Sequence, residues 1–227
     1  MTNGTAEAPL LTVRGEARIE TDPEVARVWV TVSARGRDRR QVLEDLTRRN
    51  SAALDLIRSY GDAVERASSG SFSVVPEPAP HGRGERVRAY HGRVRIAARL
   101  TDFTALGELV TRLADLDLTL VEGPEWELRA DSAVPAEARR AAARDAVQRA
   151  REYAEALGTT LAALVELTDD EPGRAPRSRA NFSRSVMQVS AAAAESAPAP
   201  LDLEPPRLTV EAAVTARLTL RPPVLNP

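Results

Sequence analysis

The clearest pattern in this chain is a strict alternation of apolar and polar residues along four stretches. Towards the C-terminus, for example, Leu208 and Val210 alternate with Thr209 and Glu211. A period of two places successive side chains on opposite faces of a β-strand. We therefore expect long strands, each with one apolar and one polar face, at residues 11–19, 26–32, 87–100 and 207–221. Shorter strands are expected at residues 72–75, 119–128 and 161–167.

The period changes to that of a helix in three stretches, residues 38–60, 103–115 and 135–157. The first opens with Asp38 and Gln41, spaced as in a capping box, and the third carries mostly alanine on its apolar side. Strands with one apolar face are typical of an antiparallel sheet that is covered on one side. We predict an α+β fold, with one face of an antiparallel sheet, or of more than one, covered by about three helices.

Two segments interrupt these patterns. Residues 77–85 are rich in Pro and Gly, and residues 169–206 are rich in Arg and Ser, then in Ala and Pro. Such composition is typical of loops and linkers. The predicted organisation is a tail at 1–9, the main part of the domain at 10–168, a flexible insertion at 169–206, a final strand at 207–221 and a tail at 222–227.

The composition excludes several kinds of chemistry. The chain has no Cys, and all 31 of its basic residues are Arg, so disulfides, thiolate catalysis and the lysine of a phosphate-binding loop are absent. Its two histidines, His81 and His91, are too few for a zinc site without carboxylates. We expect no catalytic residue, no cofactor and no metal. The formal net charge of −2 gives no overall attraction for nucleic acid, which we do not expect as a partner.

Two groups of residues are candidates for binding. Trp29 falls among the polar positions of its strand, and Arg27, Arg93 and Arg95 fall on the polar face of the same predicted sheet. Trp and Arg are enriched at interface hot spots, although a shift of one residue in register would turn Trp29 to the core. In the insertion, a cluster of arginines around one aromatic could bind RNA or an acidic partner. Its members are Arg174, Arg177, Arg179, Phe182 and Arg184.

With these elements placed, the chain resembles the SIMPL-domain family over almost its whole length. Residues 13–32, VRGEARIETDPEVARVWVTV, are similar to the opening hairpin of that family. Residues 72–76 followed by Tyr90 resemble a short strand, a variable loop and an aromatic at the head of a long strand. Residues 138–164 resemble its Ala-rich helix ending in A-x-A-L-G, and residues 200–220 its final strand.

The resemblance implies a mixed α/β fold, assembly into rings or larger oligomers and a stress-related role, and it implies no established catalytic residues. Many bacterial relatives are periplasmic, but residues 1–9 lack the features of a secretion signal and no transmembrane segment is visible, so we expect a cytoplasmic protein. We expect a non-enzymatic module that acts by self-assembly, through unpaired sheet edges, or by binding a protein partner. One alternative is an enzyme or small-ligand carrier with a cleft near Tyr90 and His91. The other is binding of nucleic acid or an acidic partner through residues 174–184.

Overall fold

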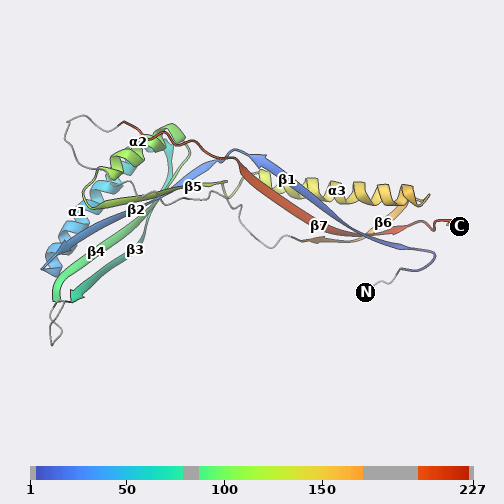
Figure 1. Ribbon diagram of the computed structural model, residues 1–227, viewed down its shortest axis with the longest axis horizontal. Coiled ribbons are helices and arrows are strands. Elements are labelled where there is room, and N and C mark those ends of the chain that lie inside the picture. Colours follow the sequence, from blue (N-terminus) through green and yellow to red (C-terminus); the bar gives the residue numbers. More distant parts are fainter. Residues whose placement is uncertain (1–3, 79–86, 171–198, 225–227) are drawn as a thin grey trace. The chain divides into compact units, whose positions relative to one another are not determined.

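The computed structural model describes residues 4–78, 87–170 and 199–224. They form three α-helices and seven strands in two antiparallel sheets, so the chain has an α+β fold (Figure 1). Contacts divide the chain into two compact units. The three-stranded unit comprises the described parts of Met1–Asp22, Leu128–Ala180 and Arg207–Pro227, and the four-stranded unit comprises Pro23–Glu127 with residues 199–206.

The three-stranded unit is a sheet with one helix on it. Its strands lie in the order β1 (Leu10–Thr21), β7 (Leu208–Leu220) and β6 (Leu161–Asp169). Helix α3 (Val134–Ala156) packs on β1 and β7 and barely touches β6. The long pairing of β1 with β7 joins the two ends of the chain, from Leu10 opposite Thr219 to Thr21 opposite Leu208.

Alanine determines how closely α3 approaches its sheet. Every fourth residue from Ala138 to Ala154 is an alanine on the buried side of the helix. At Gly15 in β1 a Cβ atom would overlap the backbone of α3 at Ala142 and Ala146. The helix backbone therefore lies directly on the strand, and only glycine fits at that position.

The four-stranded unit has a larger sheet and two helices. Its strands lie in the order β3 (Val64–Pro78), β4 (Val87–Leu100), β2 (Val25–Gly36) and β5 (Thr119–Glu127). Helices α1 (Arg39–Arg58) and α2 (Phe103–Ala114) cover one face, and a short 3₁₀ turn (Gly61–Ala63) follows α1. The core between them consists of large aliphatic side chains, among them Leu46, Ile57, Leu106, Leu109 and Val30.

A short segment on the way to β7 lies against α2. The Leu201 N–H donates to the buried Thr111 Oγ1 at 3.0 Å, and Thr111 in turn donates to the Gly107 carbonyl at 2.8 Å. A Cβ on Gly107 would overlap the Leu201 carbonyl. Residues 199–206 are thereby held on the four-stranded unit before the chain enters β7.

The helices and long strands predicted from the sequence are confirmed. Most of their boundaries differ from the prediction by no more than two residues. Asp38 caps α1 by accepting from the Gln41 N–H at 2.9 Å, and Asp102 caps α2. Helix α1 ends at Arg58, before Tyr60, and Gly61 with φ +52° begins the 3₁₀ turn that follows. Strand β3 is much longer than the predicted residues 72–75, because bulges and exposure on both faces at the sheet edge remove its alternation.

The opening hairpin implied by the resemblance is wrong. Strand β1 pairs with β7, whereas β2 pairs with β4 and β5, so the two strands belong to different sheets. Thr21 is still part of β1, Asp22 and Pro23 have no regular structure, and a bend falls at Glu24, so no tight turn joins the two strands. Polar side chains of β1 and Trp29 of β2 consequently lie in separate units rather than on one shared face.

Candidate interaction surfaces

Trp29 lies on the face of the four-stranded sheet that carries no helix. Its neighbours Val28 and Val30 are fully buried under α1 and α2, so the alternation of β2 turns Trp29 to the other side. There it is half-buried, opposite Ala97 on β4 and Glu122 on β5. The register therefore places the indole outside the core, on the open face of the sheet.

Two of the predicted arginines surround this indole. The Arg95 guanidinium carbon lies 4.3 Å from the centroid of the Trp29 ring and that of Arg27 lies 5.8 Å from it, both within range of a cation–π interaction. Both arginines also have acidic partners on β5. Arg27 is 2.9 Å from Glu127, and Arg95 is 3.6 Å from Glu122.

The acidic side chains of β5 are the part of this surface that sequence reasoning missed. Burial raises the pKa of Glu127 above its ordinary value, even though Arg27 and Arg99 favour its charged form. The glutamates of β5 offset the positive charges of Arg27 and Arg95, so the surface around Trp29 is close to charge balance. The alternation of β5 on either side of Gly123-Pro124 indicates a strand that carries these glutamates on one face. It does not indicate that this strand pairs with β2.

Arg93 is on the same open face but lies further along β4. It is exposed, between Ser33 of β2 and Ser73 of β3, and it has no acidic partner among the described residues. The structure thus brings Trp29, Arg27 and Arg95 together and leaves Arg93 towards the end of the sheet where β4 begins.

Tyr90 and His91 do not share a cleft. They are consecutive in β4, so their side chains point to opposite faces of the sheet. His91 borders a shallow hollow of about 580 Å³ whose rim includes Ser33, Asp117 and Leu120. In the described part of the chain His91 makes no hydrogen bond to a carboxylate, and no cluster of acidic or histidine side chains there could hold a metal ion. The second predicted group, Arg174, Arg177, Arg179, Phe182 and Arg184, lies outside the described residues.

Strand β6 is a surface that the sequence did not single out by residue. It forms one edge of its sheet, and almost all of it is exposed. Its apolar side chains include Leu164, Val165 and Leu167, with exposed fractions of 55%, 41% and 51%. Leu164 pairs with Leu218 and Leu167 with Ala216, so both leucines continue the apolar face that α3 covers over β7.

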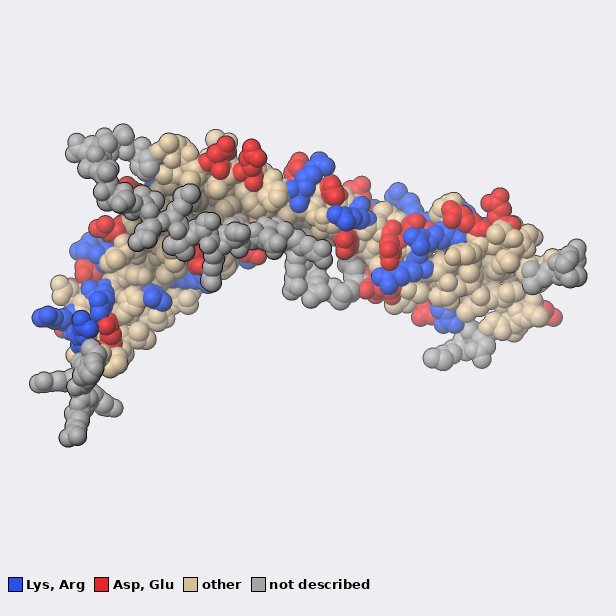
Figure 2. All heavy atoms as spheres, in the orientation of Figure 1, with Lys and Arg blue, Asp and Glu red and all other residues tan. Residues whose placement is uncertain are grey.

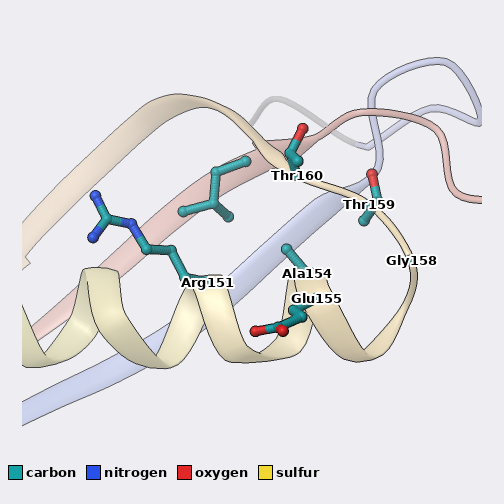
Figure 3. A pocket seen from close by; sticks show the side chains of 7 residues that line it. Arg151, Ala154, Glu155, Gly158, Thr159 and Thr160 are labelled. Carbon is teal, nitrogen blue, oxygen red and sulfur yellow. The ribbon is translucent and has the colours of Figure 1, made fainter.

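An open hollow marks the place where α3 leaves β6 uncovered. It has a volume of about 630 Å³ and lies between the end of α3 and the start of β6, lined by Arg151, Glu155, Thr160 and Leu161 among others (Figure 3). Gly158, with φ +64°, provides the turn that separates helix from strand. The arrangement offers no converging set of polar groups, so it marks a gap in packing rather than a reaction centre.

Fold and surfaces together define an α+β module with helices on one face of each of two sheets and an uncovered apolar edge. A family model described as SIMPL, a protein of unknown function (DUF541), matches residues 11–218. The chain therefore belongs to the SIMPL family. No curated protein matches it. None of the helices in the described ranges is both long and apolar enough to cross a membrane.

Proposed function

We propose that this chain is a binding module rather than an enzyme, and that it works by self-assembly through the free edge of β6. The observation that carries the proposal is the row of exposed leucines on an edge strand. Leu164 and Leu167 belong to the apolar face of the sheet, yet no described element lies over them. Exposed apolar area of this kind is typical of an interface.

Strand β6 has two irregularities in its register with β7, but the other features that usually protect an edge strand are missing from it. Such strands commonly carry lysine, proline or inward-pointing charges, which prevent pairing with another chain. In LAALVELTD the only charges are Glu166 and the terminal Asp169, and Glu166 is neutralised by Arg217 on β7 at 2.9 Å. Among the described residues no strand pairs with the outer side of β6.

The occupant that fits best is the β6 strand of a second copy. A two-fold interface places the same patch on both subunits, and antiparallel pairing of two identical edge strands satisfies that symmetry. It would join two three-stranded sheets into one of six strands. The leucines of both copies would then share the space between the two α3 helices, next to the hollow at Arg151 and Thr160.

Sedimentation velocity over a range of protein concentrations tests the proposal. We expect the full chain to self-associate, and Leu164→Glu to weaken the association on the order of a hundredfold, because the charge enters the interface twice. Leu120→Glu in the four-stranded unit is the matched control, since Leu120 is equally exposed at 57%. A chain that is monomeric at every concentration, or a control that dissociates equally, would overturn the proposal.

A further inference from the structure

One end of the four-stranded unit carries a dense group of arginines. All six are exposed, and they come from three elements and the turn between two of them. We call this group the arginine end; its members are Arg35, Arg37, Arg39, Arg40, Arg88 and Arg93. Blue side chains gather at this end in the space-filling view (Figure 2).

The topology brings these residues together. Strand β2 ends at Gly36, which pairs with Tyr90 near the start of β4, and Tyr90 also pairs with Pro76 near the end of β3. Helix α1 begins only three residues after β2, at Arg39. The end of β2, the end of β3, the start of β4 and the first turn of α1 therefore lie at one extremity of the sheet (Figure 1).

Few acidic groups balance these arginines. In the stretches 35–40, 75–78 and 87–93 that form this end, Asp38 and Glu77 are the only acidic residues, so these stretches have six arginines against two carboxylates, a formal excess of four. The whole chain carries −2, so the remainder carries −6. Asp38 is engaged in capping α1, and Glu77 holds Arg35 at 2.7 Å, which leaves the other five arginines without an acidic partner in the described part of the chain.

Glu77 is the carboxylate that lies closest to several of these basic groups. The hydrogen bond from Arg35 lowers the pKa of the Glu77 carboxyl, and the nearby charges of Arg88 and His91 lower it further. One carboxylate is thus surrounded by three basic side chains.

Two of the arginines occupy positions that a helix disfavours. The first turn of α1 contains Arg39 and Arg40 and no acidic residue. Because the N-terminus of a helix carries a partial positive charge, cations there are unfavourable and anions are favourable. Residues that a local preference disfavours are often found at functional sites. An anionic surface against this end would offset the repulsion between the two arginines and the helix N-terminus.

We propose that the arginine end docks this protein on an anionic lipid surface. Basic clusters of four to eight residues are attracted to anionic headgroups. Aliphatic side chains stand beside the cations: Val75 of β3 is 52% exposed and Val87 of β4 is 46% exposed. Entry of these valines into the interfacial region adds apolar contact that a phosphate backbone alone could not provide.

Nucleic acid fits the same end less well. Single strands are bound by aromatic side chains on which bases stack, within a basic groove. Tyr90 is half-buried and points to the helix-covered face, and none of the six arginines lines the hollow beside His91. The rest of the chain is negatively charged, so a long polyanion could contact the protein only at this one end. A planar membrane would contact only one end in any case.

Co-sedimentation of the full chain with vesicles tests the proposal. We expect binding to vesicles of equal parts phosphatidylcholine and phosphatidylglycerol, weakening as salt rises, and no binding to phosphatidylcholine alone. Arg37→Gln/Arg39→Gln/Arg40→Gln should reduce the partition coefficient on the order of a hundredfold, given the contribution of each arginine near an anionic surface. Val75→Ser should reduce it by a few fold.

The matched control is Arg139→Gln/Arg140→Gln/Arg144→Gln, which removes three exposed arginines from α3 in the other unit. Equal loss in both triple variants, or equal binding to neutral vesicles, would overturn the proposal. So would a gel shift with single-stranded RNA that the first triple variant abolishes while no vesicle binding occurs. Repeating the comparison in Leu164→Glu separates lipid docking from self-association, because docking should survive there in weakened form.

Discussion

In the three-stranded unit one helix covers the sheet with alanines, whereas in the four-stranded unit two helices cover it with leucine, valine and isoleucine. Small residues let α3 approach until its backbone meets Gly15, and large residues hold α1 and α2 further from their sheet. Neighbouring strands lie about 4.8 Å apart and a helix is about 10 Å wide, so one helix covers about two strands. Two helices cover β2 and β4 and part of β5 but leave the edge strand β3 exposed, and one helix covers β1 and β7 but leaves the edge strand β6 exposed.

The two units also differ in which part of the sheet is exposed. The four-stranded unit has a core of large aliphatic side chains and carries its candidate binding residues on the open face and at one end. The three-stranded unit has an incomplete cover and presents an apolar edge. The exposure of the third strand follows from the single helix of this unit, which contacts β1 and β7 and hardly reaches β6.

The largest effect should come from adding one methyl group at Gly15. Gly15→Ala places a Cβ against rigid helix backbone, and we expect a loss of about 3 kcal/mol or more in the free energy of unfolding. The matched substitution Gly92→Ala meets the tips of Leu46 and Val42 side chains at 3.1 Å, which can shift, so its loss should stay near about 1 kcal/mol.

Two probes distinguish the units in that experiment. Urea unfolding followed by far-UV circular dichroism reports both, while the fluorescence of Trp29 and Trp126, the only two tryptophans, reports the four-stranded unit. Equal losses for the two glycine variants would contradict the view that α3 is held by backbone contact.

A smaller effect is expected from the carboxylate that ties α3 to β1. Asp145 Oδ2 accepts the Glu16 N–H at 2.9 Å and also the Arg149 Nε–H at 2.9 Å. Asp145→Ala should lower the free energy of unfolding by about 1–2 kcal/mol, because the hydrogen bond to a charged acceptor is lost. Asp45→Ala on α1 removes only an exposed pair with Arg48 and should change it by about 0.5 kcal/mol or less. A thermal melt of both variants checks the difference, and equal shifts would count against it.

The smallest effect concerns pH at the arginine end. The lowered pKa of Glu77 means that its charged form is favoured in the folded state, so this contribution is present above about pH 4.5 and disappears as pH falls through the lower, folded-state pKa. Glu77→Gln should therefore reduce stability slightly near neutral pH and flatten the acid limb of the stability curve. Melting temperatures of wild type and variant between neutral and acidic pH test this, and a constant difference across the range would contradict it.

The sequence predicts elements well here because alternation and helical periodicity are local. Strand β7 and the alanine helix are found within two residues of their boundaries. The face of β2 on which Trp29 lies was left open by the sequence, and the burial of Val28 and Val30 in the structure decides it. Pairing is a different matter, because β1 finds its partner almost two hundred residues away at β7. A local pattern carries no information on that choice, so the resemblance to a hairpin was misleading.

The candidate surfaces, too, are only partly predictable from local sequence. The basic run from Arg35 to Arg40 is visible in the sequence, but Arg88 and Arg93 join it only through the register of β2 with β4. The leucines of β6 look like ordinary core positions, since Leu164 and Leu167 have the pattern of a buried strand. Their exposure depends on the reach of α3, which no residue of β6 determines.

The pairing of β1 with β7 also affects the order in which the chain can fold during synthesis. Residues 23–127 hold every strand and helix of the four-stranded unit in one continuous stretch, so its core can close while the rest is still being made. The three-stranded sheet needs β7, which ends only at Leu220. Until then β1, the first strand to emerge, has no partner, and α3 has little of its sheet to cover. A chain stopped before residue 208 would keep one core and never complete the other.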